Sequence, residues 1–171
     1  MGCLDWLVKL FKRKQDARIM MDKVGEQERI VRFLLSPLHF KTDGSLRPNA
    51  FNPSPNSDEV SVNRLDITPI EETKFIAKTM AAKNSKYTYF GFALHTKQSA
   101  ILCGVKDVVP DPIEGNNAHA EIKLGVVREN NDIPAEMLEI RDNLVERCKL
   151  LKDSNPDQEG WSGEVPVYDR I

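Results

Sequence analysis

Three histidines are the residues of this chain best suited to bind a metal or to act as a general base: His39, His95 and His119. Only His119 has a ligand-type neighbour at short spacing, Glu121, and in a strand these two side chains project from the same face. A zinc site would need two further ligands, for which Cys103 and His95 are the available candidates. The sequence therefore predicts no metal site.

The three cysteines, Cys3, Cys103 and Cys148, are widely spaced and odd in number. This pattern excludes a disulfide framework and a cysteine-rich zinc module. Cys103 follows an apolar run and Cys148 lies on the apolar side of a predicted helix, so both are expected to be buried and unreactive. The sequence contains no glycine-rich phosphate loop, nucleophile elbow or paired-cysteine motif.

Arg32, Ser61 and Glu121 form a second candidate set, because each falls in a segment predicted to be a strand. An arginine, a strand serine and a strand glutamate in this order resemble the arrangement of ADP-ribosyltransferase-type enzymes. The resemblance implies that the arginine grips a phosphate of NAD, the serine supports the nicotinamide ribose, and the glutamate stabilises an oxocarbenium-like transition state. Ser61 is followed by Val62-Asn63 instead of completing a Ser-Thr-Ser motif, and paired glutamates are absent. The alternative is that all three are ordinary strand residues at the surface.

A second resemblance spans residues 30–127, which are similar to a family of small bacterial proteins with no assigned activity. It rests on four short segments: Arg47-Pro48-Asn49-Ala50-Phe51, Val60-Ser61-Val62, Asp111-Pro112 and Ala118-His119-Ala120. The resemblance implies one coherent domain and suggests that a set of polar residues gathers around the proline-rich loop, namely His39, Arg47, Ser61, Arg64 and His119. Such a set would bind an anionic ligand or an acidic protein surface. Alternatively, Arg47 and Arg64 pair with nearby surface carboxylates.

The elements that position these residues follow from periodicity and breakers. Strands are predicted over 59–65, 87–94 and 118–127. Segment 29–35 reads as a buried strand or as the end of a helix that begins near Gln15, and segment 99–105 as a strand or a short helix. Gly91 indicates a bulge or a close approach within its strand. The spacing predicts a helix from Thr68 to about Asn84, with Thr68 as its cap and Pro69 as its first residue. Its expected apolar face consists of Ile70, Phe75, Ile76, Ala77 and Met80.

A second helix is predicted from Ile133, capped by Asp132 and extending to Leu151. Between the first two strands, residues 38–58 are rich in proline, asparagine and serine and form a long loop, a type of segment that is usually functional. The order of elements predicts an α+β fold: a small mixed or mainly antiparallel sheet with helices packed on one face, plus an N-terminal amphipathic helix.

Charge is unevenly distributed along the chain. Lys and Arg number 24 against 26 Asp and Glu, a net charge of −2, which argues against a protein that coats nucleic acid. Residues 1–23 nevertheless carry six basic against three acidic side chains. An apolar stripe is followed there by a basic cluster, a pattern that fits an anionic membrane surface, a partner protein or the chain's own domain. The residues concerned are Leu4, Trp6, Leu7 and Phe11, then Lys12, Arg13 and Lys14.

Three regions are therefore predicted: a basic amphipathic helix over 1–23, a single α+β domain over 24–152, and a polar tail over 153–171. Within the tail, segment 163–168 reads as an edge strand or as disorder. Trp6 stands where the N-myristoylation pattern has Ser or Thr, and no apolar run reaches the length of a membrane span, so a cytoplasmic location is expected.

The function predicted from these features is that of a bacterial-type accessory protein that binds a protein partner, without catalysis and without a cofactor. Its expected contact surfaces are the proline-rich loop at about 38–58 and the amphipathic helix. One alternative is an ADP-ribosyltransferase-like enzyme that uses NAD through Arg32, Ser61 and Glu121. A second is a peripheral membrane adaptor.

Overall fold

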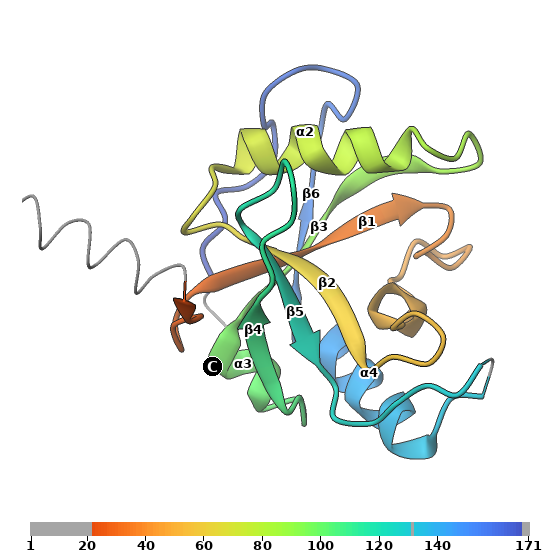
Figure 1. Cartoon of the computed structure of the whole chain (residues 1–171). Coiled ribbons are helices and arrows are strands. Elements are labelled where there is room, and N and C mark those ends of the chain that lie inside the picture. The colour runs from red at the N-terminus through yellow and green to blue at the C-terminus, as the bar shows by residue number, and fades with distance from the viewer. Residues whose placement is uncertain (1–21, 131, 169–171) are drawn as a thin grey trace, which may run out of the picture.

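The computed structural model describes residues 22–130 and 132–168. Six strands form one antiparallel sheet in the order β4-β5-β2-β1-β3-β6. The strands are β1 (Arg29–Ser36), β2 (Glu59–Arg64), β3 (Thr88–Thr96), β4 (Asp107–Pro110), β5 (His119–Lys123) and β6 (Lys149–Lys152). The helices are η1 (Pro48–Phe51), α2 (Ile70–Ala81), α3 (Lys97–Ile101) and α4 (Ala135–Arg147). The fold is α+β, as predicted, with a fully antiparallel sheet (Figure 1).

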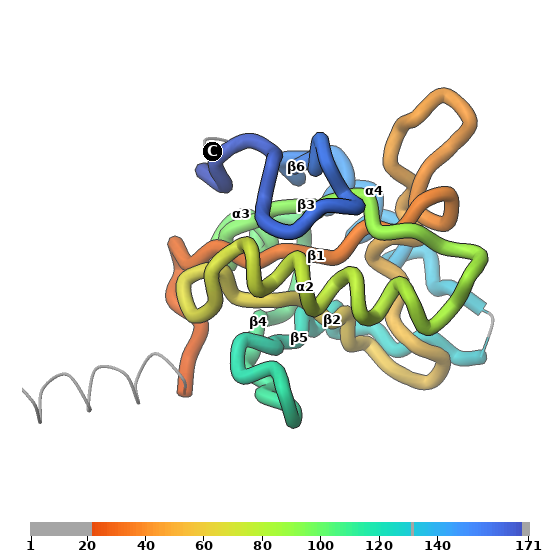
Figure 2. The backbone as a smooth tube through the Cα atoms, turned by 90° about the horizontal axis from the view of Figure 1, so that it is seen from above, coloured from red at the N-terminus to blue at the C-terminus, as the bar shows by residue number. Residues whose placement is uncertain are grey.

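The two long helices lie on opposite faces of the sheet, which corrects the expectation that the helices share one face (Figures 1 and 2). Successive residues of β1 alternate between the two cores, because side chains alternate across a strand. Ile30 and Leu34 pack with Met137 and Leu144 of α4 on one face. Val31 packs with Ala77 of α2 on the other.

Helix α2 buries Ala77, as predicted, but otherwise differs from the predicted face. Its buried residues are Thr73, Lys74, Ala77 and Ala81. Phe75 and Met80 are exposed instead. The two small alanines allow the helix backbone to lie close to the sheet, so the bulkier residues are turned away from it.

Both long helices begin one residue or more after the predicted cap. The N-cap of α2 is Pro69 and that of α4 is Pro134, each in an extended conformation and without a side-chain cap hydrogen bond. The predictions of Thr68 and Asp132 as caps are therefore wrong. Proline has a fixed φ that suits either position, so the sequence pattern did not separate the cap from the first helical residue.

The strand predictions were partly right. Segment 99–105 begins within the short helix α3 and contains no strand. Strand β5 ends at Lys123 because Gly125 turns the chain with a φ of +80°. Strands β4 and β6 were missed, since four residues each give little periodicity. Leu151, assigned to a helix, lies in β6, and segment 163–168 contains no strand.

Gly91 marks a close approach, as predicted. A Cβ atom at this position would lie 2.1 Å from the carbonyl oxygen of Leu151. The pairing of β1 with β3 also shifts register at this level, between Leu34 and Leu35. The missing side chain at Gly91 thus lets β6 pair with β3 at this point.

Candidate functional site

A groove of about 410 Å³ lies between α2 and the loop that joins β4 to β5. Its floor comes from β1, β2 and the start of β5, the half of this sheet face that lies beside α2. Three exposed apolar residues line its sides: Phe75 is 70% exposed, Met80 49% and Ile113 48%. Large apolar side chains that share one groove at such exposure are typical of a binding surface.

Two asparagine side chains that hydrogen-bond to each other fix the wall of the groove opposite α2. Asn63 Nδ2 donates to Asn116 Oδ1 at 3.3 Å, and Asn116 Nδ2 donates to Asn63 Oδ1 at 2.9 Å. Both residues are buried. Since Asn116 belongs to the loop and Asn63 to β2, this pair holds the loop that carries Ile113 against the sheet.

Ser61 and Glu121 lie directly opposite each other in the β2–β5 ladder. The Ser61 hydroxyl donates to Glu121 Oε1 at 3.1 Å, and His119 Nε2 lies 3.4 Å from the same oxygen. Burial raises the pKa of the Glu121 carboxyl, while the charge of His119 and the hydrogen bond from Ser61 act in the opposite direction. The other oxygen, Oε2, is buried and has no hydrogen-bond partner in the described part of the chain.

Arg32 joins this group from β1. Its Nη1 donates to the carbonyl of Ser61 at 2.8 Å, and its Nε donates to the carbonyl of Ala50 at 2.8 Å. Burial lowers the pKa of the Arg32 guanidinium to about 10, with the Glu121 carboxylate acting against that shift. The structure thus brings Arg32, Ser61 and Glu121 close together, with two donors of the arginine directed at backbone carbonyls. Arg32 and Ser61 line the groove.

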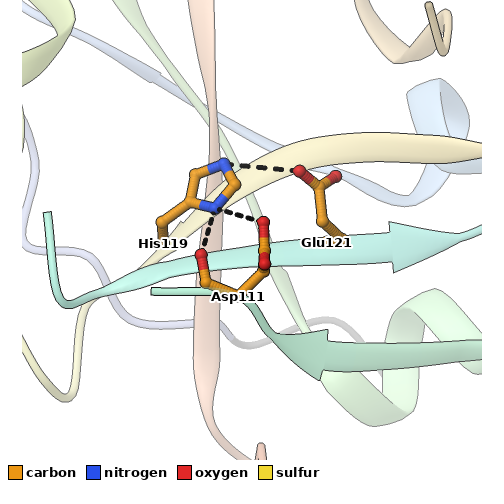
Figure 3. A group of neighbouring side chains, drawn as sticks. All are labelled: Asp111, His119 and Glu121. Atoms are coloured by element: carbon orange, nitrogen blue, oxygen red, sulfur yellow. Dashed lines mark hydrogen bonds and ion pairs between the residues drawn. The ribbon is translucent and has the colours of Figure 1, made fainter. Parts of the chain in front are cut away.

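His119 also contacts Asp111, the residue that follows β4. His119 Nδ1 lies 2.6 Å from the Asp111 carbonyl oxygen and 3.3 Å from its carboxylate Oδ2. Figure 3 shows the imidazole ring between the carboxylates of Asp111 and Glu121. The sequence reasoning paired His119 with Glu121 but missed Asp111. The signal for it was Pro110-Asp111-Pro112, which ends β4 and opens the short loop to β5, so that Asp111 lies beside the start of the next strand.

The other residues named for a metal site lie elsewhere. His95 is buried, with one ring nitrogen 3.0 Å from Ser99 Oγ and the other 2.9 Å from the Leu144 carbonyl. The Cys103 thiol is buried and donates to the Ser99 carbonyl, and burial raises its pKa to about 11.

The remaining members of the predicted ligand-binding set occupy separate positions. Arg64 forms a buried ion pair with Glu28, with Arg64 Nε 2.5 Å from Glu28 Oε1. His39 is buried, and its Nδ1 accepts from the backbone amide of Leu35. Arg47 is exposed, and its backbone amide donates to the His39 carbonyl. Of the five residues in the predicted set, Ser61 and His119 line the groove, and His39, Arg47 and Arg64 do not.

The proline-rich loop 38–58 has a structural role around η1. Ala50 and Phe51 are fully buried, and η1 packs against α4. The predicted membrane or partner surface lies outside the described residues, because Leu4, Trp6, Leu7, Phe11, Lys12, Arg13 and Lys14 all precede residue 22.

No protein-family model, curated protein or solved structure matches the chain. In the ranges 22–130 and 132–168, the structure has no helix with the length and apolar character needed to cross a membrane.

Proposed function

We propose that the chain is a non-catalytic binding protein whose protein partner inserts an apolar side chain into the groove beside α2. The observation that carries this proposal is the orientation of α2. The helix directs Phe75 and Met80 into the groove opposite Ile113, while it buries Thr73 and Lys74. A helix that buries a lysine and exposes a phenylalanine is unusual unless the exposed face has a use.

The groove combines apolar sides with polar groups on its floor, which suits a peptide segment. An inserted side chain would contact Phe75, Met80 and Ile113. The Ser61 hydroxyl oxygen, whose proton is donated to Glu121, can accept a hydrogen bond from the peptide backbone. The volume of about 410 Å³ accommodates one large side chain together with neighbouring backbone.

The two contact regions expected from the sequence have different places in this proposal. The proline-rich loop supports the groove indirectly, because the carbonyl oxygen of Ala50 in this loop accepts a hydrogen bond from Arg32, which lines the groove. The basic helix over 1–23 stays a proposed second contact, to the partner or to an anionic membrane surface.

Peptide selection tests the main proposal. A random peptide library panned on the full chain is expected to enrich sequences that share a large apolar residue. Their binding should be lost in Phe75→Asp and in Met80→Asp, because a carboxylate in the groove would need to be desolvated. Leu138→Asp, at an exposed apolar position on α4, is the matched control and should bind as the wild type does. Enriched peptides that bind Phe75→Asp as tightly as the wild type would contradict the proposal.

A transferase that uses NAD is the second candidate, favoured by the adjacency of Arg32, Ser61 and Glu121. In this case, the full chain should release nicotinamide from NAD, and Glu121→Gln should abolish that release while leaving the protein folded. NAD that stays intact with the wild-type chain would reject this candidate.

A further inference from the structure

Asp111, His119 and Glu121 converge from two adjacent strands at the edge of the sheet. Asp111 directly follows β4, and its backbone amide donates to the His119 carbonyl at 3.0 Å, which fixes the two residues side by side. Glu121 lies two residues beyond His119 on the same strand and therefore on the same face. One ligand-type atom from each of the three side chains lies within 4.8 Å of the others (Figure 3).

The hydrogen bonds of His119 determine which ring nitrogen is available as a ligand. Nδ1 lies 2.6 Å from the Asp111 carbonyl oxygen, which only accepts, so Nδ1 carries the proton of the neutral ring. Nε2 then presents its lone pair to Glu121 Oε1 at 3.4 Å. Two acceptors that face each other at this distance are satisfied either by a proton on Nε2 or by a cation bound beside both atoms. An Nδ1 proton donated to a carbonyl is also the usual arrangement behind a histidine that binds a metal through Nε2.

The Glu121 carboxylate provides an independent indication of a ligand. Glu121 is only 8% exposed, and its Oε1 accepts from Ser61. Its Oε2 is buried without a hydrogen-bond partner among the described residues. A buried carboxylate oxygen that has lost water and gained no donor is unfavourable, and a cation held by both oxygens of this carboxylate would remove that cost.

We propose that Asp111, His119 and Glu121 bind one divalent transition-metal ion, with Zn²⁺ as the type ion, through one imidazole nitrogen and two carboxylates. The 3.4 Å between His119 Nε2 and Glu121 Oε1 is close to the edge of a zinc tetrahedron, which is about 3.3 Å for ligand bonds of about 2.0–2.1 Å. A mixed nitrogen and oxygen donor set suits this class of ion. Two carboxylates and a neutral imidazole also balance its charge of +2.

The site is open on one side. The Asp111 side chain is 54% exposed, so its carboxylate is accessible to solvent and can rotate onto the ion. With three protein ligands, a four-coordinate ion keeps one position for water or another small molecule. His119 lines the groove, so that position lies beside it.

Cobalt(II) spectroscopy tests the site directly. The full chain is treated with EDTA, exchanged into metal-free buffer at pH 7.5, and titrated with Co²⁺ and then with competing Zn²⁺. The expected result is one Co²⁺ per chain, with visible absorption of nitrogen and oxygen coordination and without the charge-transfer band of a thiolate ligand. Zinc should displace the cobalt with an affinity in the micromolar range or tighter, that is, a Kd on the order of 1 μM.

Variants decide which residues bind the ion. His119→Gln, Glu121→Gln and Asp111→Asn should each weaken binding by about tenfold or more. Asp107→Asn is the matched control: it removes a carboxylate from the same edge strand, where Asp107 pairs with Lys97. Far-UV circular dichroism in EDTA establishes that each variant is folded, and Asp111→Asn retains the backbone carbonyl that orients His119.

Two results would overturn the proposal: binding weaker than about 1 mM in the wild type, or unchanged affinity in His119→Gln or Asp111→Asn. The proposal does not depend on the peptide-binding function. Phe75→Asp should leave metal affinity unchanged, and Asp111→Asn tests the metal site without altering the apolar sides of the groove, so the two proposals can fail separately.

Discussion

The Ser61 hydroxyl donates a hydrogen bond to Glu121 Oε1 across 3.1 Å, between directly opposed residues of β2 and β5. Because Glu121 also contacts His119 and lies near Arg32, this bond joins residues from three strands into one cluster beside the groove. The orientation of the Glu121 carboxylate is thus set by the sheet register.

The Ser61–Glu121 hydrogen bond should be measurable as a coupling energy. A double-mutant cycle with Ser61→Ala and Glu121→Gln is expected to give about 1–2 kcal/mol in the free energy of unfolding, because the bond is partly buried and its acceptor is an acid group. Urea unfolding in EDTA measures it. A cycle of Ser61→Ala with Glu59→Gln, which pairs with Lys123, is the control and should be near zero. Equal couplings in both cycles would contradict the bond.

The orientation of α2 predicts opposite effects at neighbouring positions. Phe75→Ser should change the free energy of unfolding by less than about 0.5 kcal/mol, since the ring is exposed. Ala77→Leu should destabilise the protein by about 1–3 kcal/mol, because Ala77 is fully buried against the sheet. Urea unfolding curves of the two variants provide the comparison. A larger loss in Phe75→Ser than in Ala77→Leu would indicate that Phe75 is buried and would contradict this orientation of α2.

The buried ion pair of Lys74 and Asp153 should make single substitutions costly. Lys74 Nζ lies 2.7 Å from Asp153 Oδ2 and also donates to the carbonyls of Asn155 and Gly160. Lys74→Met would leave a buried carboxylate without its partner and is expected to destabilise the protein by about 3–5 kcal/mol. The double variant Lys74→Met/Asp153→Leu should recover part of this loss in thermal and urea unfolding, whereas no recovery would show that the backbone contacts dominate.

His39 should contribute to the pH dependence of stability. Burial, assisted by the charge of Arg32, lowers the pKa of this histidine from 6.5 to about 4. The unfolded chain therefore binds a proton that the folded chain does not, so this contribution is complete above about pH 6.5 and is lost as the pH falls toward about 4. The full effect is roughly 3 kcal/mol. The stability difference between wild type and His39→Gln, measured in urea at pH 7 and pH 4.5, should shift against the wild type at the lower pH; a constant difference would contradict it.

The sheet could be predicted from the sequence wherever local patterns are strong. Alternation over 59–65 located β2, whereas the apolar run over 29–35, which forms β1, suited the end of a helix equally well. Gly91 indicated a bulge or a close approach, and in the structure the approaching segment is β6. Strands β4 and β6 were not predicted, because each has only four residues and so shows too little periodicity. Their pairing also depends on contacts between residues that are distant in sequence. The buried face of α2 was not fully predicted, because two alanines and a lysine that pairs with Asp153 stand where large apolar residues are usual.

The candidate site was likewise predicted only in part from the sequence. Arg32, Ser61 and Glu121 were named from the sequence, and the structure brings them together. Asp111 was missed as a neighbour of His119 because the turn between β4 and β5 had to be known first. Arg64 was placed in a ligand site although Glu28, remote in sequence, pairs with it in the interior.

The limited pairing of β1 with β2 has a mechanical consequence. Ile30 pairs with Arg64 and Val31 with Asn63, and beyond them Arg32 reaches across to the Ser61 carbonyl, whereas β1 pairs with β3 along its whole length. The sheet therefore consists of two three-stranded halves, β4-β5-β2 and β1-β3-β6, which are joined only by the short β1–β2 pairing. The groove lies across this junction, with Arg32 on one side and His119 on the other. A molecule bound in the groove would contact both halves of the sheet and hold them together. Its binding would therefore slow amide hydrogen exchange even on strands that it does not contact.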